Sequence, residues 1–162
     1  MEKNYRPNAC AVVFNHMGKV LLCKRRYGVD QFSWQFPQGG IEPGESPAEA
    51  ARRELAEETS VVSAVEVLSL PDPFCYDFPK DVIEKFIRQR GFSYDGQKQY
   101  WSLFYFAGED TEINLNTAEP EFIAWEWADI KTAADRVWPV KREMYAEATA
   151  ILAQKIASYL KI

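Results

Sequence analysis

The stretch from Gly39 to Val61, GGIEPGESPAEAARRELAEETSV, constrains the fold of this chain more than any other. Ser46, Pro47 and Glu49 form a complete helix start, because serine can cap the helix, proline suits its first position and glutamate can close a capping box. The segment that follows, AEAARRELAEE, is rich in strong helix formers. The pattern therefore predicts a glycine-rich turn followed by a helix that ends at about Thr59.

Three glutamates crowd the second half of this predicted helix. Glu54, Glu57 and Glu58 are three or four residues apart, so their side chains can converge on one face. A solvated helix face is the commoner fate of such residues, but repulsion between Glu54 and Glu58 and the helix dipole both disfavour them here. Local rules are broken most often at functional sites. A hard divalent cation such as Mg²⁺ or Mn²⁺ would hold such carboxylates together.

Strand patterns and cations precede the glycine turn. Residues 9–14 and 19–25 are β-rich runs around a polar turn with Gly18, which predicts a hairpin. The charge cluster Lys24–Arg26 ends the second run and is, by itself, as readily a solvated surface as a site. The segment Ser33–Gly40, SWQFPQGG, predicts a short strand broken by proline, and its glycines allow the backbone to approach a ligand or metal.

The second half of the chain mixes strand and helix patterns. We expect strands within 61–70, 96–108 and 121–127, a proline-broken loop over 71–81, a helical or irregular link over 81–90, and a C-terminal region with a short helix, a break at Pro139 and a long amphipathic helix. The helical spacing places Met144, Ala148, Ile151, Leu152 and Ile156 in the core. Glu121 enters the last strand, where a lone glutamate is more often solvent-facing than functional.

Composition limits the class of protein. At 162 residues with 47% hydrophobic residues, the chain has the size of one domain with a packed core. Its formal net charge of −5 argues against binding duplex DNA through a basic surface. Three scattered cysteines favour reduced thiols, and no apolar run reaches membrane-spanning length. We expect a soluble, cytoplasmic protein with no membrane contact; the sequence leaves its oligomeric state open.

The glycine–helix stretch resembles the signature of the Nudix hydrolases, in which glycine, arginine and glutamate occupy fixed positions around one helix. The matching residues are Gly39, Glu45, Arg53, Glu54, Leu55, Glu57, Glu58 and Val61. Ser60 departs from the pattern, which has glycine there. Because the residue after a helix is commonly left-handed, Ser60 is expected to cost about 1 kcal/mol of strain without touching the chemistry.

Residues 5 to 150 resemble one branch of that family, which contains the bacterial RNA pyrophosphohydrolases and the similar diadenosine tetraphosphate hydrolases. The matching segments are YRPN from Tyr5, SWQFPQGGI from Ser33, YDFP from Tyr76, GQKQ from Gly96, INLNTAEPEF ending at Phe122 and VKREMY from Val140. Two positions depart: Tyr100 stands where a basic residue often follows GQKQ, and Val140 replaces a frequent phenylalanine. Both bear on substrate choice more than on reaction type.

The resemblance implies an α/β fold of one domain over residues 1–162, an α/β/α sandwich with a mixed β-sheet and a loop–helix–loop metal site. It implies Mg²⁺ as the cofactor, with Mn²⁺ or another divalent ion as the alternative. The implied metal ligands are the backbone carbonyl of Gly39 and the carboxylates of Glu54, Glu57, Glu58 and Glu121.

The same resemblance implies roles for individual side chains. Glu54, Glu57 and Glu58 form the implied catalytic set, with Glu57 our first choice and Glu58 our second for activating the attacking water. Arg53 is expected to pair with a nearby glutamate and steady the helix rather than touch substrate. The implied substrate contacts are Arg6, Arg26, Lys98 and Lys141 to the polyphosphate and Tyr76 to a base.

Three functions are compatible with these residues. The first is an RNA 5′-pyrophosphohydrolase, which removes pyrophosphate from triphosphorylated transcripts. The second is asymmetric hydrolysis of dinucleoside tetraphosphates, and the third is a sensor of nucleotides or RNA 5′ ends without turnover. The complete set of signature carboxylates argues against the sensor. Metal-assisted cleavage of a phosphoanhydride is the expected chemistry.

Overall fold

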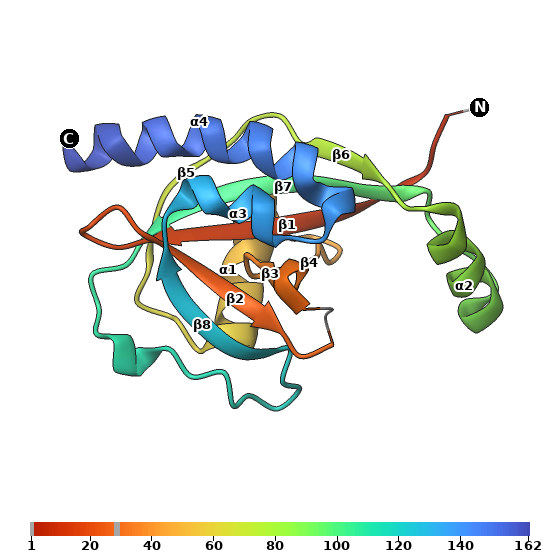
Figure 1. Ribbon diagram of the computed structural model, residues 1–162, viewed down its shortest axis with the longest axis horizontal. Coiled ribbons are helices and arrows are strands. Elements are labelled where there is room, and N and C mark those ends of the chain that lie inside the picture. Colours follow the sequence, from red (N-terminus) through yellow and green to blue (C-terminus); the bar gives the residue numbers. More distant parts are fainter. Residues whose placement is uncertain (1, 28–29) are drawn as a thin grey trace.

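The computed structural model describes residues 2–27 and 30–162 and has a central β-sheet with helices on both faces (Figure 1). The described strands are β1 (Tyr5–Phe14), β2 (Val20–Arg25), β3 (Trp34–Gln35), β4 (Gln38–Gly40), β5 (Val65–Ser69), β6 (Phe74–Asp77), β7 (Gly96–Tyr105) and β8 (Phe122–Ala128). The described α-helices are α1 (Pro47–Thr59), α2 (Lys80–Arg90), α3 (Ala133–Arg136) and α4 (Arg142–Leu160). Short 3₁₀ turns occupy Asp30–Phe32, Asp110–Glu112, Ile130–Thr132 and Pro139–Lys141.

The central strand of the sheet is β1. It pairs in parallel with β7 and antiparallel with β2 and β4, so the sheet is mixed. The sheet continues antiparallel from β2 to β3 and β8, and from β7 to β5 and β6. The hairpin predicted over the first two runs is confirmed, with Gly18 at φ 75° in its turn.

Two hydrophobic cores form because alternate residues of β1 face opposite sides of the sheet. The first core contains Cys10, Val12 and Phe14 of β1 with Met144, Tyr145 and Leu152 of α4. The second contains Ala9, Ala11 and Val13 of β1 with Ala50, Ala51 and Leu55 of α1. The chain thus has the α/β sandwich that the sequence predicts.

The signature helix α1 begins and ends as its sequence predicts. The Ser46 hydroxyl accepts from the Glu49 N–H at 3.1 Å, and the Glu49 carboxylate accepts from the Ser46 N–H at 3.2 Å, which completes the capping box. Ser60 ends the helix at φ 67°, in the left-handed region expected for this position. Its hydroxyl donates to the Asn114 carbonyl at 2.8 Å, so the serine anchors the loop that lies beside it.

Substitutions at Ser60 are expected to separate backbone strain from this hydrogen bond. Ser60→Ala keeps the left-handed strain and loses the bond, so its free energy of unfolding should fall by about 1 kcal/mol. Ser60→Gly loses the same bond but relieves about 1 kcal/mol of strain, so it should match the parent protein. Urea unfolding measures both; an alanine variant as stable as the glycine variant would contradict this account.

Two expectations for the second half of the chain are wrong. Residues 71–81, predicted as a loop, contain β6 and the start of α2, because β6 pairs with β7 and places Cys75 opposite Lys98. Ile151, predicted in the core, is 41% exposed. The buried stripe of α4 instead runs through Met144, Ala148, Leu152 and Ile156, which are four residues apart. All three cysteines are free thiols, and only Cys75 is exposed. None of the described helices is both long and apolar enough to cross a membrane.

Candidate active site

A cavity of about 590 Å³ opens between the C-terminal part of α1, the β6–β7 edge, α2 and the turn before α4. Its wall combines three kinds of side chain. The charged ones are Arg25, Glu58, Glu121 and Lys141; the aromatic ones are Tyr27, Phe32, Tyr76, Phe78, Phe86 and Trp138; the amides are Gln35, Gln38 and Gln97. Acidic, basic and aromatic groups in one cavity suit a phosphorylated nucleotide held near a cation.

Glu54 and Glu58 form a close carboxyl pair, of which Glu58 lines this cavity. Glu58 is only 6% exposed, and its carboxyl accepts from the Gln38 N–H at 3.1 Å and shares a hydrogen bond with Glu54. Burial, reinforced by the negative charge of Glu54, raises the pKa of Glu58 to about 9. The pKa of Glu54 is raised too, mainly by burial. Among the described residues, no cation forms an ion pair with Glu58.

Glu57 lies apart from that pair. Its side chain is 57% exposed and its carboxylate accepts from Arg53 at 3.3 Å. The predicted convergence of three glutamates is therefore found for two of them. Glu57, the third glutamate, points toward solvent and Arg53, because it precedes Glu58 by one residue and so lies on a different side of the helix.

Arg53 is the centre of an ion-pair network that holds α1 against the glycine turn. Its guanidinium donates to Glu45 at 2.7 and 2.9 Å, to Glu54 at 2.8 Å and to the Gly40 carbonyl at 2.9 Å. The bond from Arg53 lowers the pKa of Glu45 to about 2. Arg53 pairs with nearby glutamates, as expected, and the same network accounts for the fixed Glu45 of the signature.

Gly39 lets the backbone of β4 touch the carboxyl of Glu54. A Cβ built on Gly39 would collide with the carboxyl carbon and both oxygens of Glu54. Glycine at this position therefore leaves room for a carboxylate beside the strand. The backbone of Gly39, whose carbonyl is a predicted metal ligand, thus lies next to the Glu54–Glu58 pair.

Glu121 lines the cavity from the start of β8. It immediately precedes β8 and lines the same cavity as Glu58, close enough for its charge to raise the pKa of Glu58 further. Its carbonyl accepts from the Arg26 N–H at 2.8 Å, which fixes the entry to β8. The structure thus brings Glu121, predicted as the fourth carboxylate, to the glutamate pair from outside the helix.

Lys141 and Tyr76 form the opposite wall. The Lys141 ammonium lies 5.6 Å from the centroid of the Tyr76 ring, and the side chain of Lys141 is buried. Burial, together with the charge of Arg25, lowers the pKa of Lys141 to about 8. The Tyr76 hydroxyl donates to the side-chain carbonyl of Gln97 at 2.7 Å, and Tyr76 is only 8% exposed.

Three predicted cationic contacts lie outside this cavity wall. Arg6 lines a neighbouring cavity, with its guanidinium against Gly40. Lys98 belongs to the opposite face of β7 from Gln97, because side chains alternate along a strand. Arg26 lies in the exposed turn after β2, with its guanidinium carbon 5.6 Å from the Tyr27 ring.

The residue that sequence reasoning missed beside Arg26 is Arg25. Arg25 lines the cavity because the pairing of β2 with β8 shifts register between Lys24 and Arg25. A β-bulge of this kind re-aims the side chain that follows it. The charge cluster was a usable signal, but it does not reveal which of its members lines the cavity. Gln97 was also missed, although GQKQ places it on the buried face of β7.

The oxygen atoms gathered at this site suit a hard divalent cation such as Mg²⁺. Within residues 2–27 and 30–162, no three acidic, histidine or cysteine side chains are arranged closely enough to hold a metal ion as they stand. The neighbouring donors of Glu54, Glu58 and Gly39 are nevertheless all oxygen, and the buried carboxyl of Glu58 has an acidic neighbour. An added positive charge would offset that repulsion. Glu57 could join only by leaving Arg53.

Comparison with known proteins agrees with this geometry. A family model for the NUDIX domain matches residues 4–148. The chain belongs to the Nudix family. The RNA pyrophosphohydrolase of Caulobacter vibrioides is 42% identical over 148 residues, which cover 90% of this chain and 84% of that protein. The RNA pyrophosphohydrolase of Dinoroseobacter shibae is 41% identical over 145 residues, which cover 88% of each.

Solved structures of Nudix proteins share the fold. The E. coli dihydroneopterin triphosphate pyrophosphohydrolase aligns with a TM-score of 0.64 at 18% identity, over 91% of this chain and 99% of that one. A C. elegans Ap4A hydrolase aligns with a TM-score of 0.64 at 18% identity, over 92% and 98% of the two chains. At such identity the likeness shows the fold alone. The predictions of a Nudix fold and a Nudix pyrophosphohydrolase are confirmed, and enzymes of this family generally use divalent metal ions.

Proposed function

We propose that this chain, as a single Nudix domain, removes pyrophosphate from the triphosphorylated 5′ ends of RNA and leaves a 5′-monophosphate. The observation that carries the proposal is the cavity in which Glu58 and Glu121 face Lys141 and Arg25 across a partly aromatic wall. Such a cavity can hold a polyphosphate between a metal-binding edge and a cationic edge. The relatives that are about 40% identical over most of the chain carry the name RNA pyrophosphohydrolase, which supports RNA as the substrate.

Mg²⁺ is the cofactor of this proposal. Glu54, Glu57, Glu58 and Glu121 would hold it, together with the carbonyl of Gly39. When bound, it supplies positive charge that neutralises the phosphates and favours ionisation of the attacking water. Once it has left Arg53, Glu57 orients that water and accepts its proton on a carboxylate oxygen, since its side chain is open to solvent.

The basic wall binds the charge that builds up on the phosphates. Lys141 and Arg25 face the cavity and neutralise the leaving pyrophosphate, whereas Arg26 and Lys98 stay outside these cavity contacts. Tyr76 is too buried to offer a free ring face, so its role is to orient Gln97, whose amide nitrogen is then directed away from the hydroxyl. A base in this cavity would stack on exposed parts of the other aromatic side chains instead.

The test is a side-by-side measurement of kcat/KM on triphosphorylated RNA and diadenosine tetraphosphate in the presence of Mg²⁺. The proposal expects the RNA to be the better substrate, with pyrophosphate released and a 5′-monophosphate left. A clear preference for diadenosine tetraphosphate would refute RNA as the substrate while keeping the chemistry. Unchanged turnover of both substrates by Glu57→Gln would refute the role given to Glu57.

Gly39→Ala tests the metal-binding edge. The added Cβ displaces the Glu54 carboxyl, so we expect kcat/KM to fall about 10²-fold, since a misplacement near 1 Å has that effect, while stability changes little. Gly44→Ala is the matched control: Gly44 has φ 84° and open space around it, so alanine there should lower stability by about 1 kcal/mol and keep activity. Equal activity of both variants would contradict the placement of Glu54 at the site.

A further inference from the structure

Three amide side chains form a row across neighbouring strands beside the active-site cavity: Asn8 of β1, Gln38 of β4 and Gln99 of β7. Asn8 is paired with Gln99 in the β1–β7 ladder, and β4 pairs with the other edge of β1. Asn8 and Gln99 are each 1% exposed, whereas Gln38 lines the cavity. The row therefore leads from the interior of the sheet to the wall of the active site.

Gln99 reaches across β1 to contact Gln38. Neighbouring strands are about 4.8 Å apart, so β7 and β4, with β1 between them, are separated by about 10 Å. The Gln99 amide nitrogen donates to the side-chain carbonyl of Asn8 at 2.7 Å and to that of Gln38 at 3.3 Å. A primary amide has two N–H donors, so Gln99 uses both of them within this row.

The other end of the Gln99 amide is left unsatisfied. Its carbonyl oxygen is buried and, within the described part of the chain, has no hydrogen-bond partner. A buried acceptor in this state lowers stability, and an apolar side chain of similar size would fill the space without that loss. Glutamine at this position therefore indicates a role for its two donors beyond filling the core.

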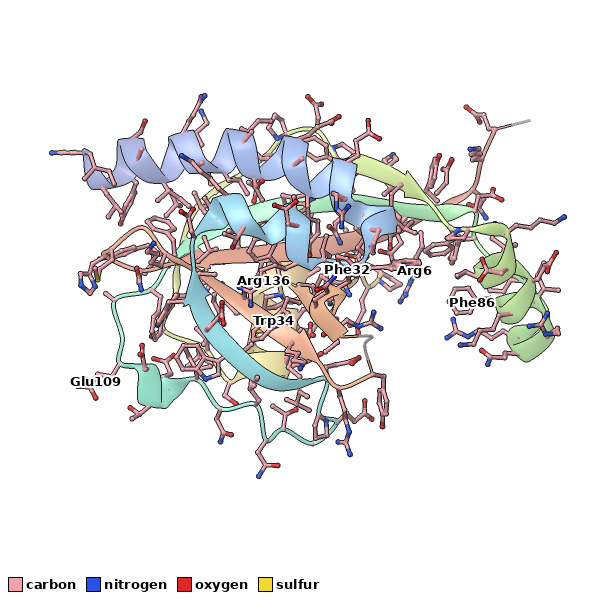
Figure 2. All side chains as sticks on the ribbon, viewed as in Figure 1. Arg6, Phe32, Trp34, Phe86, Glu109 and Arg136 are labelled. Atoms are coloured by element: carbon pink, nitrogen blue, oxygen red, sulfur yellow. The ribbon has the colours of Figure 1, made fainter. Side chains whose placement is uncertain are left out.

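The bond from Gln99 decides which end of the Gln38 amide faces the cavity. The Gln38 carbonyl oxygen is turned toward Gln99, so its nitrogen, which only donates, is left for the cavity. The backbone N–H of Gln38 donates to Glu58 at 3.1 Å, which places this amide beside the carboxyl pair. The cavity that receives it lies between Phe32 and Phe86 (Figure 2).

We propose that Gln99 is a positioning residue, which acts through Gln38 by holding the nitrogen of its side-chain amide toward the bound polyphosphate. Without Gln99, the Gln38 amide is free to turn its carbonyl oxygen toward the phosphates, which repel it. Gln99 is not part of the cavity lining, so it does not touch the substrate itself. The inference rests on the proposed function, because the anion is the polyphosphate of the substrate.

The experiment measures binding of pyrophosphate with Mg²⁺ to the full chain by calorimetry, which requires no turnover. Gln38→Met should weaken binding about tenfold, the loss of one hydrogen bond to a charged group. Gln99→Met should weaken it about fivefold, because the donor orientation becomes one of several that Gln38 adopts. The double variant should match Gln38→Met alone, since Gln99 acts only through Gln38.

Two further variants separate this role from a structural one. Gln99→Asn keeps a buried amide that is too short to reach across β1, so it should lose as much affinity as Gln99→Met. Ser102→Ala is the matched control: Ser102 is also fully buried in β7, is bonded to the Ser69 hydroxyl at 2.7 Å and lies outside the cavity lining. It should keep the parent affinity, while urea unfolding measures the stability of every variant.

The outcomes that overturn the proposal are distinct. Losses that multiply to about fiftyfold in the double variant would mean that Gln99 acts independently of Gln38. Parent affinity in Gln99→Asn and Gln99→Met, or an equal loss in Ser102→Ala, would show that Gln99 does not position Gln38.

Steady-state kinetics on triphosphorylated RNA give a second readout. Gln99→Met should raise KM about fivefold and leave kcat within about twofold, because the Gln38 contact is made in the ground state and the transition state alike. A fall in kcat with KM unchanged would mean that Gln99 supports Glu58 instead, which overturns the proposal. Coupled losses of pyrophosphate affinity in a protein that does not hydrolyse the RNA would support the role of Gln99 and refute the proposed function.

Discussion

Replacing Glu58 by glutamine is expected to lower kcat about 10³-fold and, at the same time, to stabilise the metal-free protein. The loss follows because the proposed cation loses a carboxylate ligand beside the phosphates, where charge stabilisation amounts to several kcal/mol. The gain follows because glutamine fills the same space without the burial cost of a charged group next to Glu54. Steady-state kinetics and urea unfolding in a chelator measure the two effects.

The pH dependence of that stability has a definite sign. The pKa of Glu58 is about 9 in the folded chain and near 4.5 in the unfolded chain, so the folded state binds the proton more tightly. The metal-free parent should therefore lose stability as pH rises from about 4.5 to 9, and Glu58→Gln should lose less over that window. Glu119→Gln, an exposed glutamate two positions before Glu121, is the control and should change neither quantity. A Glu58→Gln variant that is less stable than its parent at pH 8 would contradict the crowding of these carboxyls.

Sequence predicted the signature helix in detail because every determinant of α1 is local. The capping box of Ser46 and Glu49 and the left-handed Ser60 need only neighbouring residues, and the structure has all of them. Gly39 was named from the resemblance to the Nudix signature, and the structure adds a reason for glycine there, because a Cβ would collide with the Glu54 carboxyl. Where the site is built from one segment, its residues could be named before the fold was known.

The substrate wall was less predictable because it depends on pairing between distant segments. The register shift between Lys24 and Arg25 arises against β8, about a hundred residues later, and Arg25 rather than Arg26 lines the cavity. Tyr76 was expected to offer a ring to a base, but β6 pairs with β7 and buries it. Motif matching gives the residue type at a position, whereas sheet register decides which way the side chain points.

Helix α2 shows the same limit of sequence-based prediction. The pattern of residues 81–90 predicted only a helical or irregular link. The spacing of Val82, Phe86 and Arg90 cannot be interpreted until it is known what packs beside the helix. The sheet edge and the cavities beside α2 supply that neighbour, and all three residues line those cavities.

The second large effect is expected at Lys141, where function and stability oppose each other. Lys141→Met should lower kcat/KM about 10²-fold, because a phosphate in a poorly solvated cavity loses a cation. The same variant should unfold with a free energy about 1–3 kcal/mol higher at pH 7, because burial of the ammonium lowers its pKa and therefore destabilises the fold. Lys155→Met, on the exposed face of α4, is the control and should leave both quantities near the parent values.

The pH profile distinguishes a binding lysine from one that only fills space. The folded pKa of Lys141 is about 8 and its unfolded value is 10.5, so the unfolded state binds more protons between those values. Stability should rise with pH across that window in the parent and not in Lys141→Met. Over the same range kcat/KM should fall in the parent, because the free enzyme loses the charge that meets the phosphates. Lys141→Arg, which keeps its charge, should show no such fall; an identical fall in the arginine variant would mean that another group titrates.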